Sequence, residues 1–192
     1  MRSGWRGYRV VGLDFSRAML AEARRRFRHA NAAFVRGDMR RLGFDSEFDG
    51  VINLFTSFGY FSPRDNGRAL SGMARALRKG GRLLIDTRDR AYQERHPAIR
   101  SWSIIGPRYV FEDMRFDPRS GRVESDWHIV RPGRKRVLRR SLRMYVYTLP
   151  QWKRMLRRAG LRFLRAYGGY DLSPHKPGTT KRLIILGERP CR

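Results

Sequence analysis

The 192-residue sequence predicts an α/β protein in which a doubly wound, mainly parallel sheet carries an inserted antiparallel sheet. Three observations carry this prediction. Strand patterns and amphipathic helix patterns alternate up to about residue 90, as parallel strands with helical crossovers require. From residue 91 the pattern changes to consecutive strands separated by turn residues. A helix and two more strands follow from residue 148.

The first elements are a strand, an acid and a helix. The stretch "YRVVGLD" reads as a buried strand that ends on Asp14, and Ser16 can cap the helix that follows. A second strand at residues 33–36 closes on Gly37-Asp38-Met39. A third, at residues 48–54, is apolar on both faces, so we expect it to occupy a covered, parallel position.

The next unit begins at Ser62-Pro63, where a capping box and a proline both favour a helix start. Lys79-Gly80-Gly81 is expected to end that helix, and residues 82–86 form the next strand. The capping box at Thr148 opens a later helix that Gly160 ends, with strands at residues 161–167 and 182–187.

Between these parts, three strands are predicted, at residues 109–116, 122–130 and 137–147, with turns at residues 117–121 and 132–133. We therefore expect a core made of residues 1–90 and 148–192, and an antiparallel β cap made of residues 91–147.

The net charge of +26 suggests, by itself, a nucleic acid or an anionic membrane surface as partner. Much of this charge lies on predicted helix faces, however, where solvated arginines are the simpler explanation. The single cysteine, Cys191, excludes an internal disulfide, and no cluster of cysteine and histidine supports a metal site. No apolar run is long enough to cross a bilayer, so we expect a cytoplasmic protein with no membrane partner.

Several segments, in their order and spacing, carry a resemblance: "VVGLDFSRAMLAEAR", "FVRGDMRRL", "FDGVINLFTSFGYF", "ALRKGGRLLID", "YTLPQWKRMLRRAGL" and "YGGYD". With these the sequence resembles the class I S-adenosylmethionine-dependent methyltransferases, in particular members that act on small molecules. The resemblance implies a Rossmann-like fold, S-adenosyl-L-methionine as cofactor and a small-molecule methyl acceptor. The alternative is a basic nucleic-acid-binding protein or an RNA methyltransferase that uses the positive charge.

The resemblance also implies a cofactor site. Asp14 would accept both ribose hydroxyls, since a carboxylate offers two acceptor oxygens, and Phe15 would lie against the adenine. Asp38 would accept from the adenine amino group, and the Met39 amide would meet the ring. Asn53 completes the cofactor set. A plain helix cap at Asp14 and a plain turn acid at Asp38 are the structural alternatives.

The acceptor is expected where the third strand ends, because open α/β sheets bind ligands at the carboxyl edge. Phe55, Ser57 and Tyr60 are the candidates there, and Tyr145 and Tyr147 are the candidates from the cap. For the aromatic residues, a place in the core is the alternative. Methyl transfer depends on alignment more than on an acid and a base, so no catalytic residue is predicted.

One part of the family pattern has no counterpart in the sequence. The first strand and the "GxGxG" loop of the family would precede Asp14 by roughly 20 residues, and too few residues precede it here. Without that strand, we expect residues 10–11 and 51–52 to border a gap. We also expect the in-frame DNA upstream of Met1 to encode the missing segment.

Overall fold

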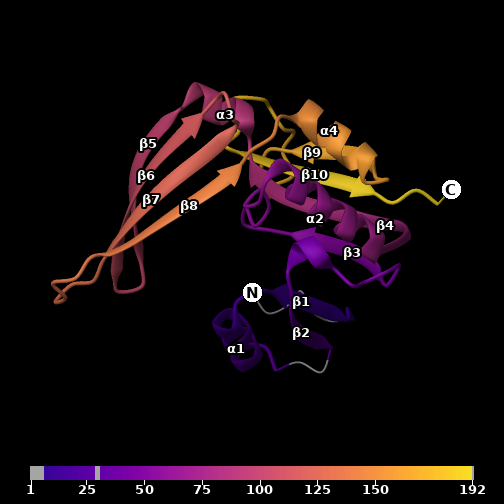
Figure 1. Ribbon diagram of the computed structural model, residues 1–192, viewed down its shortest axis with the longest axis horizontal. Coiled ribbons are helices and arrows are strands. Elements are labelled where there is room, and N and C mark those ends of the chain that lie inside the picture. The colour runs from indigo at the N-terminus through magenta and orange to yellow at the C-terminus, as the bar shows by residue number, and fades with distance from the viewer. Residues whose placement is uncertain (1–6, 29–30, 192) are drawn as a thin grey trace.

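The computed structural model describes residues 7–28 and 31–191. Residues 1–6 of the first expected domain lie outside the described residues. Within the described part, the strands form three sheets: a two-stranded sheet near the N-terminus, a four-stranded central sheet and a four-stranded antiparallel sheet that extends away from the rest (Figure 1). The α/β fold class predicted from the sequence is confirmed.

The N-terminal sheet pairs β1 (Val10–Asp14) with β2 (Ala32–Arg36) in parallel, with α1 (Arg17–Arg26) as the crossover. Ser16 begins α1 as predicted, because its side chain accepts a hydrogen bond from the Met19 N–H at 3.3 Å. The arginines of this helix are exposed, which agrees with a solvated face. A short 3-10 helix, η1 (Met39–Arg41), follows β2.

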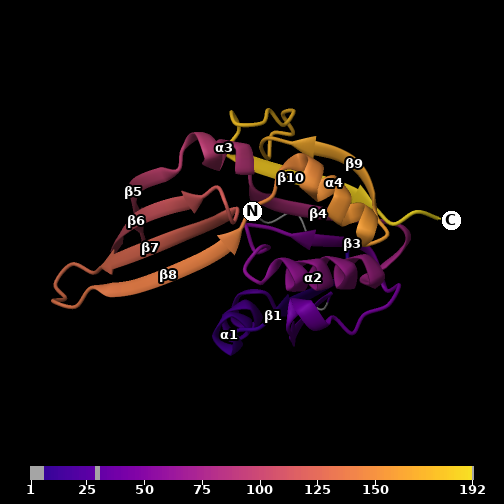
Figure 2. The same cartoon turned by 45° about the horizontal axis from the view of Figure 1, so that its top comes forward.

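The central sheet has the order β3-β4-β10-β9, with bounds β3 (Phe48–Asn53), β4 (Leu77–Arg88), β9 (Arg162–Tyr167) and β10 (Arg182–Glu188). β3 and β4 run parallel, while β10 is antiparallel to both of its neighbours. Helices α2 (Pro63–Ala76) and α4 (Leu149–Arg158) lie side by side against this sheet (Figures 1 and 2). The main core lies between these two helices and the central sheet. It includes the fully buried residues Leu70, Leu83, Ile85, Trp152, Leu156 and Leu183.

The boundary between α2 and β4 differs from the prediction. The helix ends at Ala76, before the expected Lys79-Gly80-Gly81, and the strand begins at Leu77. Leu77 is fully buried and pairs with Phe48 of β3, so packing draws it into the sheet. Gly80 then turns the chain inside the strand at a φ of 76°, and its N–H donates to the Arg189 carbonyl at 2.7 Å.

The expectation that residues 48–54 are covered on both faces is wrong for Ile52, which is 68% exposed. Among the described strands, β1 pairs only with β2 and β3 pairs only with β4. Each therefore has one edge without a partner in this part of the chain, and apolar side chains near those edges face solvent. The strand expected between β1 and β3 stays a prediction.

The third sheet contains β5 (Ala98–Ile105), β6 (Arg108–Asp117), β7 (Arg122–Val130) and β8 (Leu138–Tyr145), in that order. The last three are the strands predicted for the insertion. The sequence analysis missed β5 because polar and apolar side chains alternate only over residues 101–104 and nearly all of its residues are exposed. It also missed the short helix α3 (Arg90–Arg95), which Asp89 caps. We call these four strands the cap sheet.

Candidate active site

The carboxyl ends of β1, β3 and β4 carry Asp14, Asn53 and the residues around Asp86. The loop after β3 meets the end of the cap sheet directly, because the Tyr145 N–H donates to the Gly59 carbonyl at 2.8 Å. Gly59 has a φ of 112°, and a Cβ at this position would lie 2.4 Å from the Tyr145 carbonyl oxygen. Only glycine allows this approach, and it brings two candidate segments, residues 55–60 and Tyr145, together.

Asp14 has one carboxylate oxygen in use. Its Oδ1 accepts from the Ser16 N–H at 2.7 Å, and its Oδ2 has no partner among the described residues. The neighbouring Phe15 ring is 68% exposed, with the Arg36 guanidinium 5.4 Å from its centroid. Asp14 thus orders the start of α1 and still presents an acceptor oxygen beside an open aromatic surface.

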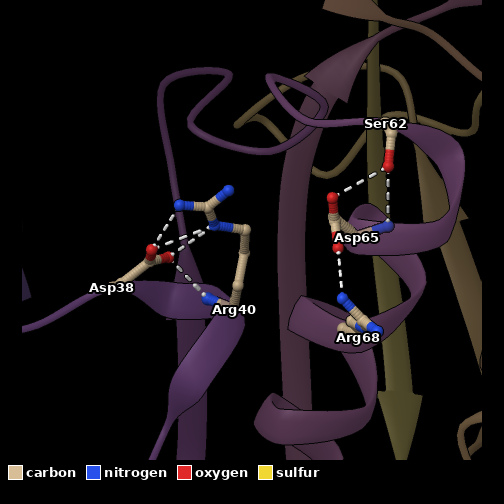
Figure 3. Close-up of polar contacts among 5 residues, drawn as sticks. All are labelled: Asp38, Arg40, Ser62, Asp65 and Arg68. Atoms are coloured by element: carbon tan, nitrogen blue, oxygen red, sulfur yellow. Dashed lines mark hydrogen bonds and ion pairs between the residues drawn. The ribbon is translucent and has the colours of Figure 1, made fainter.

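Asp38 forms an ion pair with Arg40 (Figure 3). Its carboxylate accepts from the Arg40 Nη2 at 2.6 Å and from the Arg40 backbone N–H at 2.9 Å. The side-chain hydrogen bonds from Arg40 hold the pKa of Asp38 below its ordinary value. Met39 begins η1, where backbone N–H groups have no acceptor within the helix. A ligand that bonds to Asp38 must therefore share this carboxylate with Arg40.

A second acid and arginine pair in Figure 3 belongs to the start of α2. The Ser62 hydroxyl accepts from the Asp65 N–H at 3.1 Å and donates to the Asp65 carboxylate at 2.9 Å, and Arg68 pairs with the same carboxylate. The hydrogen bond from Ser62 is the main cause that lowers the pKa of Asp65. These contacts form the serine half of the predicted capping box, so they serve the helix start.

The sequence analysis missed Asp86, a completely buried acid at the end of β4. Its carboxylate accepts from the Phe55 N–H at 2.8 Å, from the Tyr170 hydroxyl at 2.6 Å and from the Arg182 guanidinium. The Asp86 carbonyl also accepts from the Thr56 N–H at 3.2 Å. Asp86 thus joins the loop after β3 to residues that lie more than 80 positions later in the chain. The motif "YGGYD" contained Tyr170 but gave no role for it.

Two residues of that loop are held in an uncommon conformation. Phe55 and Thr56 have positive φ values of 54° and 59°, which side chains other than glycine rarely adopt. Such strain persists only where surrounding contacts fix it, and it concentrates at functional sites. The Asp86 contacts provide that fixation. They leave the Phe55 ring 75% exposed, with the Tyr170 ring 6.4 Å away in an edge-to-face arrangement.

The remaining candidates differ in their surroundings. Asn53 is only 8% exposed, and its Oδ1 is buried without a hydrogen-bond partner among the described residues. Ser57 donates to the Leu54 carbonyl at 2.7 Å, within its own loop. Tyr60 is partly exposed, and burial raises its pKa, so its hydroxyl stays protonated at neutral pH.

Tyr147 is the candidate that lies closest to the core. Its hydroxyl accepts from the Asn66 Nδ2 at 2.9 Å, and its ring meets the buried Trp152 ring edge to face at 5.6 Å. Burial raises the pKa of Tyr147. These contacts occupy the side chain within the fold, which is the core alternative raised by the sequence. A role in acceptor binding stays a prediction for Tyr147 and for the other four candidates.

No group of three or more metal-ligating side chains occurs among the residues that the structure describes.

Comparison with known proteins finds similarity to methyltransferases. Residues 2–81 match the family described as "Methyltransferase domain". A demethylmenaquinone methyltransferase of Beutenbergia cavernae is 44% identical over 80 residues, which are 41% of this chain and 31% of the relative. Over these residues the chain is similar to methyltransferases.

Two further comparisons cover a larger part of this chain. The ubiquinone/menaquinone biosynthesis C-methyltransferase UbiE of Pectobacterium carotovorum is 31% identical over 144 residues, 72% of this chain and 51% of the relative. The structure of the CcbJ methyltransferase from Streptomyces caelestis superposes with a TM-score of 0.82 at 15% identity, covering 95% of this chain and 75% of that one. The chain therefore spans about half or less of the length of these curated relatives, and the Rossmann-like methyltransferase fold extends over nearly all of it.

Proposed function

We propose that this protein is an S-adenosylmethionine-dependent methyltransferase of the cytoplasm that acts on a small-molecule acceptor. The observation that carries the proposal is the position of Asp14 beside the open Phe15 ring, with one carboxylate oxygen that has no partner among the described residues, in a chain that matches the methyltransferase domain over residues 2–81. Bound at this edge, the cofactor supplies an electrophilic methyl group, and the chain's own residues bind and align the two reactants.

In this proposal Asp14 accepts from the ribose hydroxyls, and Phe15 covers one face of the adenine. Asp38 and the Met39 N–H meet the adenine edge. The Oδ1 of Asn53 is buried and has no partner among the described residues, which supports its place in the site, because a buried acceptor without a donor is costly and a ligand would relieve that cost. The described residues offer no glycine-rich loop for the methionine end of the cofactor. We propose that a further strand, lying in space beside the open edges of β1 and β3, and the loop that follows it complete the site.

The acceptor lies, in this proposal, over the loop of residues 55–60 and under the end of the cap sheet, near Phe55, Ser57, Tyr60, Tyr145 and Tyr147. Asp86 fixes that loop through the Phe55 and Thr56 N–H groups. Several relatives bear names of quinone or amino-sugar methyltransferases. An apolar or aromatic acceptor with a nucleophilic oxygen, nitrogen or carbon suits a loop lined by exposed aromatic rings.

Calorimetry with S-adenosylhomocysteine tests this proposal. The affinity for S-adenosylhomocysteine is measured with the 192-residue chain and with a form extended by the in-frame upstream codons. The extended form is expected to bind more tightly. Asp14→Ala should weaken binding roughly 10- to 100-fold, the loss of hydrogen bonds to a charged group. Asp45→Ala, at an exposed acid bonded within its own turn, is the matched control and should leave affinity unchanged. Absence of binding in both forms, or equal binding by Asp14→Ala, overturns the proposal.

A further inference from the structure

One end of the cap sheet lies farthest from α2 and α4 (Figures 1 and 2). The sequence concentrates positive charge at this end. The antiparallel register brings the β5–β6 turn and the β7–β8 loop to this same end, since Ile105 pairs with Arg108 and Ile129 with Leu138. We call residues 102–109 and 129–140 the distal tip. The distal tip has no acidic residue, and its seven basic residues are Arg108, Arg131, Arg134, Lys135, Arg136, Arg139 and Arg140.

Among the described residues, no ion pair uses these cations, although Arg140 donates to the Arg139 carbonyl at 3.0 Å. All the ion pairs of the cap sheet involve arginines outside the distal tip, such as Arg100 with Asp113. A hollow of about 450 Å³ lies at the tip, and its walls are formed by Arg108, Ile129, Arg131, Arg134, Arg136 and Leu138. Four uncompensated guanidinium groups around two aliphatic side chains form a surface that attracts phosphate groups, which arginine binds in a bidentate manner.

The cap sheet also exposes large apolar side chains on one face, within the distal tip and directly beside it. Trp102 pairs with Phe111 and Ile104 pairs with Tyr109. Opposite residues of antiparallel strands project to the same face, and so do residues two apart in a strand, so all four side chains share a face. They are 41–65% exposed. Arg139 projects to this same face, because it pairs with His128 and His128 pairs with Phe111. The arginine-lined hollow opens on the opposite face, since Ile129 pairs with Val110. The end of the cap sheet thus carries an apolar patch on one face and a cationic hollow on the other, and such a patch marks an interaction surface.

The chemistry of the patch selects among partners. A second copy of this chain would bring the same seven cations to the contact, and like charges would oppose association. A nucleic acid would use the cations and stack on the rings, but it offers little to the exposed aliphatic chains of Ile104 and Ile105. An anionic phospholipid surface takes both kinds of group, because apolar and aromatic side chains enter the interface while arginines meet the phosphates.

We propose that the distal tip docks end-on at the surface of an anionic phospholipid bilayer, with lipid phosphates in the arginine-lined hollow on one face of the cap sheet and with Trp102 and Ile104 in the interface on the other face. This replaces the expectation, drawn from the sequence, that no membrane is involved. The proposal concerns peripheral binding: among the described residues, no helix is long and apolar enough to span a bilayer. It does not depend on methyl transfer.

Vesicle co-sedimentation tests the proposal with the full chain. Vesicles of phosphatidylglycerol and phosphatidylcholine should bind the protein, and vesicles of phosphatidylcholine alone should not. The triple variant Arg131→Gln/Arg134→Gln/Arg136→Gln should weaken binding roughly 100-fold, since each basic residue near such a surface contributes about a factor of five. A second variant, Trp102→Ser/Ile104→Ser, keeps the charge and should also weaken binding. The wild type should show a blue shift in tryptophan emission when it binds vesicles, and this variant should lose that shift.

The matched control is Arg154→Gln/Arg157→Gln/Arg158→Gln, which removes the same charge from the exposed face of α4 and should bind vesicles like the wild type. If both triple variants lose the same vesicle affinity, net charge explains the binding and the proposal is overturned. So would full competition by inorganic phosphate at millimolar concentration. Preferential binding of single-stranded RNA that both distal-tip variants abolish would assign the patch to nucleic acid. A dimer in sedimentation velocity that Trp102→Ser/Ile104→Ser dissolves would assign it to a second copy.

Discussion

Asp86 shows, at the scale of single residues, how one buried acid can organise a binding edge. Its carboxylate satisfies three donors from distant parts of the chain. Asp86→Ala would leave the Phe55 N–H, the Tyr170 hydroxyl and the Arg182 guanidinium without that acceptor. We expect a loss of about 2–4 kcal/mol in the free energy of unfolding, measured by urea denaturation, since Arg182 is partly exposed and can recover some hydration.

Asp49→Ala is the comparison for this prediction. Asp49 pairs with Arg78 at 2.9 Å, but its side chain is 86% exposed. An exposed pair of this kind contributes at most about 1 kcal/mol. If the two variants lose the same stability, Asp86 does not hold the loop of residues 55–60 in the way proposed here.

At the scale of elements, α4 has the best-defined start in the fold. The Thr148 hydroxyl accepts from the Gln151 N–H at 3.3 Å, and the Gln151 side chain accepts from the Thr148 N–H at 2.7 Å. α4 carries Trp152 and Leu156 into the main core, so fraying at its start reaches buried packing. Thr148→Ala should therefore lower the free energy of unfolding by about 1 kcal/mol.

Thr179→Ala serves as the matched control in the same denaturation series, because Thr179 is exposed and lies outside any helix. Its effect should stay within about 0.5 kcal/mol. A neutral Thr148→Ala variant would mean that the packing of Trp152 fixes the helix start without help from the cap.

For the whole molecule, stability should be unevenly distributed. The N-terminal sheet buries one hydrophobic side chain of α1, Leu20, while the central sheet shares a continuous core with α2 and α4. Regions with few buried contacts open more often than core strands. Hydrogen exchange followed by mass spectrometry should therefore show faster exchange in β1 and β2 than in β4 and β10.

The expected order of exchange rates can be contradicted by one result. Protection of β1 equal to that of β4 would mean that the N-terminal sheet is held by contacts equivalent to a shared sheet, and the open edges of β1 and β3 would then be covered in solution. Binding of S-adenosylhomocysteine should slow exchange in β1 and around Asp38 if the cofactor site is placed correctly.

Features that depend on neighbouring residues could be predicted from the amino-acid sequence. The caps at Ser16 and Thr148 and the strands of the cap sheet from residue 108 onward follow from local hydrogen bonding and from side-chain alternation. The relation to methyltransferases was also readable, because short segments in a fixed order carry it. Asp14 was correctly placed at the end of a strand for the same reason.

Contacts between distant segments could not be predicted from the sequence, because they depend on how the folded strands pair. Asp86 reads in the sequence as the last residue of a strand. The antiparallel pairing of β10 with β4 brings Arg182 to it, and the pairing of β9 with β10 brings the segment after β9, which contains Tyr170. The exposure of Ile52 depends on which strand lies beside β3, and no local pattern encodes that. The apolar face of the distal tip exists because the register sets Trp102 opposite Phe111. Local propensities choose the elements, but pairing and register over long separations choose which side chains meet.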